Sequence, residues 1–130
     1  MESVTLIAPR AYDVELRERL AQAWNVREGI AGVVIEDGGT RVCVSPNDFA
    51  AEEMEPGALQ RIVTTIRNPV FYTVDFTDID LCKRVLVAVA DDPLLLIDND
   101  HGLLLPGVEF VHILKSQPGW DWRREAGPVP

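Results

Sequence analysis

Residues 70–105 read VFYTVDFTDIDLCKRVLVAVADDPLLLIDNDHGLLL, and three structural patterns follow one another along them. Residues 70–76 are rich in β-branched and aromatic side chains, which is typical of a strand. Thr77 and the acidic residues after it are typical of a helix start, so a helix is predicted to about residue 90. Its apolar side chains share one face, which we expect to be buried: Cys82, Val85, Leu86 and Val89.

Turn sequences predict two hairpins on either side of this strand and helix. Residues 94–97 and 103–105 are predicted strands, connected across the turn at residues 98–102. Residues 30–35 and 41–44 are predicted strands joined across Asp37-Gly38-Gly39, a sequence that favours a tight hairpin turn.

The other elements follow from spacing and capping residues. Residues 4–8 form a predicted strand, and Asp13 is the predicted cap of a helix that ends near residue 24. Asn47 or Asp48 caps a short acidic helix in the prediction. The next helix, at residues 58–67, has apolar positions at helical spacing: Leu59, Ile62, Val63 and Ile66. The last predicted helix, at residues 107–116, faces inward through Phe110, Ile113 and Leu114.

This order of elements predicts an α+β fold. Hairpins mixed with helical crossovers favour one mixed, mostly antiparallel sheet with about four helices packed against it. The 130 residues contain no linker long enough for a domain boundary, so we predict a single domain over residues 1–130. Pro118-Gly119 breaks the last helix, and residues 119–130 are the predicted C-terminal tail.

The charge balance excludes several classes of partner. The chain has 12 Lys and Arg against 21 Asp and Glu, a net charge of −9. Nucleic acid and anionic membranes are bound mainly through Lys and Arg, so neither is an expected partner. The longest aliphatic runs, at residues 85–90 and 94–97, are too short to cross a bilayer, and we identify no signal peptide. We therefore expect a soluble cytoplasmic protein with reduced thiols.

No catalytic signature, cofactor motif or metal motif is present. Asp98, Asn99 and Asp100 resemble oxygen ligands of a hard cation, but they lack EF-hand spacing and their residue types favour a hairpin turn. The two histidines and two cysteines lack zinc-site spacing, and Cys43 and Cys82 are predicted structural thiols. We predict no enzyme, although a small hydrolase or metal enzyme using Asp98, Asp100 and His101 remains as an alternative.

Acidic residues are concentrated in one part of the chain. Residues 71–110 hold eight acidic residues against two basic ones, which is two-thirds of the net charge. Asp91 and Asp92 lie at a predicted helix C-terminus, where the helix dipole disfavours anions. If Asp91, Asp92, Asp98 and Asp100 converge, they form a negative patch that would steer a basic partner. The alternative is a solvated acidic rim that serves solubility.

Trp120-Asp121-Trp122 is a second unusual feature. Two tryptophans beside breaker residues can fix the C-terminus to the core. Alternatively, Trp120 and Trp122 are anchors of a protein interface, because Trp and the neighbouring Arg are frequent hot-spot residues.

The stretch from Phe71 to Trp122 resembles small bacterial immunity proteins of polymorphic toxin systems, including contact-dependent growth inhibition. The resemblance is carried by LLLIDNDHG at residues 94–102, PGVEF at 106–110 and PGWDW at 118–122. It implies a cytoplasmic protein that binds a cognate toxin domain, often a nuclease with a basic substrate groove, and blocks it. The expected partner is thus a basic toxin domain, contacted by Asp91, Asp92, Asp98, Asp100, Trp120 and Trp122. A non-enzymatic adaptor domain of a bacterial complex is the alternative function.

Overall fold

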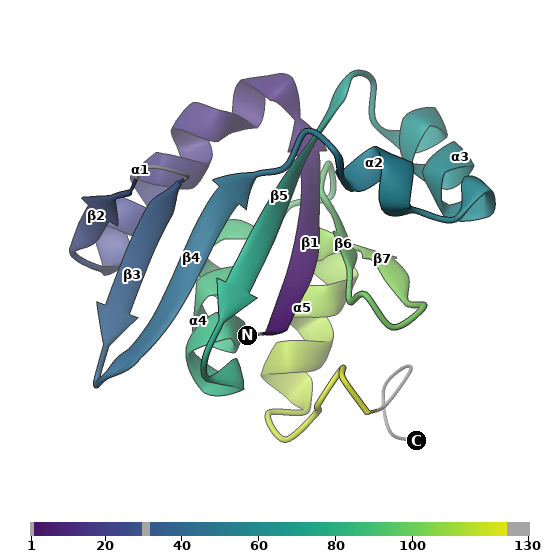
Figure 1. Cartoon of the computed structure of the whole chain (residues 1–130). Coiled ribbons are helices and arrows are strands. Elements are labelled where there is room, and N and C mark those ends of the chain that lie inside the picture. The colour runs from purple at the N-terminus through teal and green to yellow at the C-terminus, as the bar shows by residue number, and fades with distance from the viewer. Residues whose placement is uncertain (1, 30–31, 125–130) are drawn as a thin grey trace.

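A computed structural model describes residues 2–29 and 32–124, and these residues form a seven-stranded sheet with five α-helices (Figure 1). The strands are β1 (Glu2–Pro9), β2 (Val26–Glu28), β3 (Val33–Asp37), β4 (Thr40–Pro46), β5 (Pro69–Phe76), β6 (Leu96–Asp98) and β7 (Leu104–Pro106). The helices are α1 (Asp13–Ala23), α2 (Ala50–Glu53), α3 (Pro56–Thr65), α4 (Ile79–Val89) and α5 (Gly107–Ser116), with a 3₁₀ turn η1 (Arg10–Tyr12) before α1.

In space the strands follow the order β2-β3-β4-β5-β1-β6-β7, and each neighbouring pair is antiparallel. The predicted α+β class with a mostly antiparallel sheet is therefore confirmed. The N-terminal strand β1 lies inside the sheet, between β5 and β6, which are far apart in the sequence.

Helices α1, α4 and α5 lie against one face of the sheet and bury the main core there (Figure 1). Side chains of a strand point alternately to its two faces. Val4 and Leu6 of β1 therefore belong to this core, whereas Ser3 and Thr5 lie on the opposite face. Helix α4 buries the residues predicted for its apolar face and Leu81 as well.

Helices α2 and α3 cover only part of that opposite face (Figure 1). A second, smaller apolar cluster forms beneath them, where Ile62 and Ile66 pack with Ile7 and Phe71. Val63 fits the apolar spacing of this helix, but its side chain is 48% exposed. A helix at the edge of a sheet contacts it through only part of its apolar face, so some apolar side chains of that face stay exposed.

Both predicted hairpins are confirmed. Strands β3 and β4 are joined by Gly38 and Gly39, whose φ angles of +60° and +81° suit a two-residue turn that only small or flexible residues adopt readily. In the β6–β7 turn, Asp98 Oδ1 accepts a hydrogen bond from the backbone N–H of Asp100 at 2.8 Å. Asn99 Oδ1 accepts from the backbone N–H of His101 at 2.9 Å. The turn interpretation of these polar residues is therefore confirmed.

All three predicted helix caps are wrong: the cap position of α2 is Phe49, with no side-chain cap, and the other two differ from the prediction by one position. Helix α4 is capped by Asp78, not Thr77, because Asp78 Oδ1 accepts from the backbone N–H of Asp80 at 2.9 Å. The turn η1 leads directly into α1, so Asp13 lies inside the helix. Its carboxylate instead accepts a hydrogen bond from the Tyr72 hydroxyl at 3.0 Å.

Residues 120–123 of the predicted C-terminal tail pack onto the rest of the chain. Trp120 and Trp122 are each 1% exposed. Their ring centroids lie 5.0 Å and 5.5 Å from that of Phe110, within the main core. Residues 125–130 of the predicted tail lie outside the described residues.

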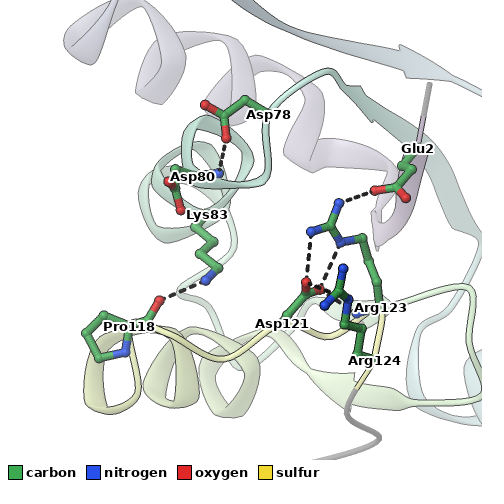
Figure 2. A network of polar contacts seen from close by, with 8 residues as sticks. All are labelled: Glu2, Asp78, Asp80, Lys83, Pro118, Asp121, Arg123 and Arg124. Atoms are coloured by element: carbon green, nitrogen blue, oxygen red, sulfur yellow. Dashed lines mark hydrogen bonds and ion pairs between the residues drawn. The ribbon is translucent and has the colours of Figure 1, made fainter.

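An ion-pair network holds this segment from its polar side (Figure 2). Arg123 Nε and Nη2 donate to Asp121 Oδ1 and Oδ2, each at 2.8 Å, and Nη1 donates to Glu2 Oε2 at 2.5 Å. The hydrogen bonds from the Arg123 guanidinium lower the pKa of Asp121 to about 2. Lys83 Nζ adds a bond to the carbonyl oxygen of Pro118 at 2.8 Å. The C-terminal segment is therefore tied to both β1 and α4.

Candidate functional site

A cleft of about 730 Å³ lies on the partly covered face of the sheet. Its floor includes Ser3, Thr5 and Thr73, which alternate with the core residues of β1 and β5. One wall comes from α2, α3 and the residues between them, and the other from the β6–β7 hairpin. A polar floor between two walls can receive a polar or charged group from a partner.

The cleft is lined by more negative than positive charge. Its acidic lining residues are Glu53, Glu55, Asp98 and Asp100, and Arg61 is its basic one. Arg61 is already engaged, because its Nη2 donates to the carbonyl oxygen of Leu104 at 3.2 Å. We call this site the acidic cleft. Its charge attracts cationic groups and repels phosphates.

Asp100 occupies a constrained position at one edge of the acidic cleft. Its backbone has a φ of +63°, in the left-handed region. Its Oδ2 and Oδ1 accept hydrogen bonds from the hydroxyls of Ser3 and Thr5, both at 3.2 Å. Burial, together with the nearby charge of Asp98, raises the pKa of Asp100, and the two hydroxyl bonds partly oppose this rise. A cation docked beside Asp100 would stabilise its charged form.

Asn47 fixes the loop that leads from the sheet into α2. Its backbone N–H donates to the carbonyl oxygen of Phe71 at 2.8 Å, and its Nδ2 donates to Thr73 Oγ1 at 3.1 Å. Its Oδ1 accepts from the backbone N–H of Phe49 at 3.1 Å. The wall formed by this loop and α2 is thus tied to the floor of the cleft.

The four predicted partner-binding carboxylates do not form a single patch. Asp98 and Asp100 lie at the turn end of β6, where Asp98 pairs with Thr5 of β1. Asp91 and Asp92 precede β6. They lie at the opposite end of β6 from Asp98 and Asp100, near the start of α5. The condition that all four carboxylates converge is not met, because the extended strand β6 lies between the two pairs.

Asp91 and Asp92 also have structural partners of their own. Asp91 Oδ2 lies 3.5 Å from Lys115 Nζ. Asp92 Oδ1 accepts a hydrogen bond from the backbone N–H of Leu94 at 2.8 Å. Asp91 and Asp92 therefore have contacts of their own outside the acidic cleft.

Glu53 and Glu55 were missed by the sequence analysis. They lie about 45 positions before Asp98 and Asp100, outside the concentration of acidic residues at 71–110. The short acidic helix was recognisable, but its position across the sheet from the β6–β7 turn was not. That position depends on β1 pairing with both β5 and β6.

Trp120 and Trp122 are not surface anchors. Both side chains are buried to 99%, so the alternative in which they fix the C-terminus to the core is confirmed. A direct contact between either indole and a partner is contradicted in this folded chain. Both rings instead complete the aromatic cluster around Phe110.

The two cysteines differ in environment. Cys82 is fully buried on α4, as predicted for a structural thiol, and burial raises its pKa. Cys43 is only half-buried, on the open face of the sheet, and burial and the charge of Asp75 raise its pKa. Raised pKa values oppose formation of the thiolate nucleophile.

Comparison of the chain with protein-family models, with curated proteins and with solved structures finds no match. Within residues 2–29 and 32–124, no group of three or more His, Cys, Asp or Glu side chains is arranged to hold a metal ion. Over the same residues, none of the helices has the length and apolar character needed to span a membrane.

Proposed function

We propose that this chain is an immunity protein, which binds a basic toxin domain and blocks it by direct occlusion. The observation that supports the proposal is the acidic cleft, a hollow of about 730 Å³ with four carboxylates and one engaged guanidinium in its lining. The resemblance of residues 71–122 to immunity proteins suggests the same function. In this proposal the protein acts in the cytoplasm, where the incoming toxin would meet its substrate.

The physical argument concerns what an acidic cleft offers to a basic partner. A domain that acts on nucleic acid holds phosphates with Lys and Arg side chains. Carboxylates placed where phosphates would bind compete for those side chains, and opposite charges also speed the encounter. Occlusion therefore requires no catalytic residue in the inhibitor.

The test begins with the C-terminal domain of a large secreted protein, expected to be encoded beside this chain. We expect the two proteins to co-purify, and co-expression to rescue cells from the toxicity of that domain. A protein that binds the domain without rescue would be an adaptor, which contradicts the proposal. A gene with no such neighbour contradicts it as well.

Charge-reversal variants then locate the contact. The side chains of Glu53 and Glu55 are exposed, and neither carboxylate has a hydrogen bond or ion pair within the described residues, so Glu53→Lys/Glu55→Lys should leave the fold intact. We expect affinity for the toxin domain to fall about 10-fold or more, measured by calorimetry at low salt. The matched control is Glu18→Lys/Glu109→Lys, which makes the same charge change at exposed positions on α1 and α5.

The control separates a local contact from a general charge effect. We expect Glu18→Lys/Glu109→Lys to weaken binding less than about 3-fold, because distant exposed charges are screened. Added salt should weaken the wild-type complex more than the Glu53→Lys/Glu55→Lys complex. Equal losses in both double variants would exclude the acidic cleft as the binding site.

A further inference from the structure

Phe49 is the one exposed aromatic side chain of this chain. The sequence has nine aromatic residues, and all of them lie among the described residues. Phe49 is 67% exposed, whereas Trp24 is partly buried and the other seven are exposed by 8% or less. A large apolar ring in water forgoes the stabilisation that burial gives to the others. Its exposure therefore suggests a contact made outside this chain.

The backbone that carries Phe49 is held in place. Its N–H donates to Asn47 Oδ1 at 3.1 Å, and its carbonyl oxygen accepts from the N–H of Glu52 at 3.1 Å. Asn47 is itself bonded to the sheet through Thr73, and the next residue, Ala50, is 5% exposed. The ring is thus presented by an ordered turn, and little backbone freedom would be lost when a partner covers it.

Acidic residues flank Phe49 in the sequence. Residues 42–60 contain four acidic residues and no basic one. These four are exposed: Asp48, Glu52, Glu53 and Glu55. Asn47 and Ala50, on either side of Phe49 in the sequence, both line the acidic cleft. An apolar centre with a charged rim is the usual arrangement of a protein-binding surface.

We propose that Phe49 is the apolar anchor of the interface with the basic partner domain. Phe49 fills an apolar pocket of that domain, whose Lys and Arg side chains pair with the surrounding carboxylates. This inference rests on the proposed function and adds to it the partner's chemistry: a protein surface with an apolar pocket inside a basic rim. A second copy of this chain would bring like charges together, which disfavours self-association through this surface.

The test compares Phe49→Ala with Val14→Ala. Val14 lies on α1 and is 66% exposed, so both variants remove an exposed apolar side chain. Neither should change the melting temperature by more than about 2 °C, because truncation of exposed side chains has small effects on stability. We expect Phe49→Ala to weaken binding of the same toxin C-terminal domain about 30-fold, and Val14→Ala less than about 3-fold.

Salt dependence distinguishes the ring from the charges. The affinity of Phe49→Ala should fall with added salt as steeply as that of the wild type, because the ring carries no charge. The affinity of Glu53→Lys/Glu55→Lys should fall less steeply, because two carboxylates are lost. If the wild-type chain binds the domain and Phe49→Ala binds equally well, the anchor role is wrong and the proposed function stands. If the wild-type chain does not bind, the proposed function fails and this inference with it. A wild-type dimer that Phe49→Ala dissociates in ultracentrifugation would make a second copy the occupant, which also overturns the proposal.

Discussion

The side-chain amide of Asn99 donates to the carbonyl oxygen of Trp122 at 2.9 Å, although the two residues are 23 positions apart. Asn99 is 0% exposed, and its Oδ1 also accepts from the backbone N–H groups of His101 and Leu103, each at 2.9 Å. One side chain therefore shapes the β6–β7 turn and holds the C-terminal segment. That turn carries Asp98 and Asp100 into the acidic cleft, so the same residue supports the candidate site.

Replacement of Asn99 should be costly. We expect Asn99→Ala to lower the free energy of unfolding by about 2–3 kcal/mol, because it leaves buried backbone groups without partners. Urea denaturation followed by tryptophan fluorescence measures this change. Asn25→Ala, at an exposed position after α1, is the control and should change stability by less than about 0.5 kcal/mol. Similar values for the two variants would show that Asn99 does not hold the segment.

The Asp121–Arg123 pair should make stability depend on acid pH. The pKa of Asp121 is lowered to about 2 in the folded chain, below its unfolded value of about 4. A lowered pKa means that the charged form stabilises the fold above pH 4, and this contribution is lost as the pH falls towards 2. We expect Asp121→Asn to cost about 1 kcal/mol at pH 7.

The measurement is the difference in unfolding free energy between wild type and Asp121→Asn at several pH values. This difference should be constant from pH 7 to about pH 5 and shrink between about pH 4 and pH 2. A difference that does not vary with pH would mean that the pair with Arg123 does not stabilise the charged form.

Two helix-start glycines should respond in opposite ways to the same substitution. A Cβ at Gly107 would overlap the carbonyl oxygen of Ala90, whereas a Cβ at Gly57 would meet nothing within 4 Å. We expect Gly107→Ala to destabilise the fold by about 2 kcal/mol or more, since backbone must move to admit the methyl group. Gly57→Ala should be neutral or stabilising by up to about 1 kcal/mol, because alanine favours helix. Thermal unfolding of both variants tests this, and a tolerated Gly107→Ala would contradict the close approach.

Hairpins and amphipathic helices were predictable because their signals are local. Gly38-Gly39 fits the turn between β3 and β4 whatever the rest of the chain does. The apolar spacing of α4 likewise predicts its buried face. Strand β2 was not predicted, because three residues carry too little pattern.

The local sequence could not predict which apolar side chains of α3 are buried. Ile62 and Val63 fit its apolar pattern equally well, but Ile62 is 0% exposed and Val63 is 48% exposed. Which of them is buried depends on how the helix meets Ile7 and Phe71 of the sheet. Ile7 lies far before α3 in the sequence, and Phe71 lies after its end.

The sequence by itself determined the α+β class, the two hairpins, the negative charge and the aromatic character of the C-terminal segment. Only the tertiary structure decided which carboxylates share a site and which aromatic side chain stays in water. Thr5 of β1 pairs with Thr73 on one side and Asp98 on the other, and this pairing brings the β6–β7 turn opposite α2 and α3. Periodicity and turn chemistry act over a few residues, whereas strand order joins residues nearly a hundred positions apart.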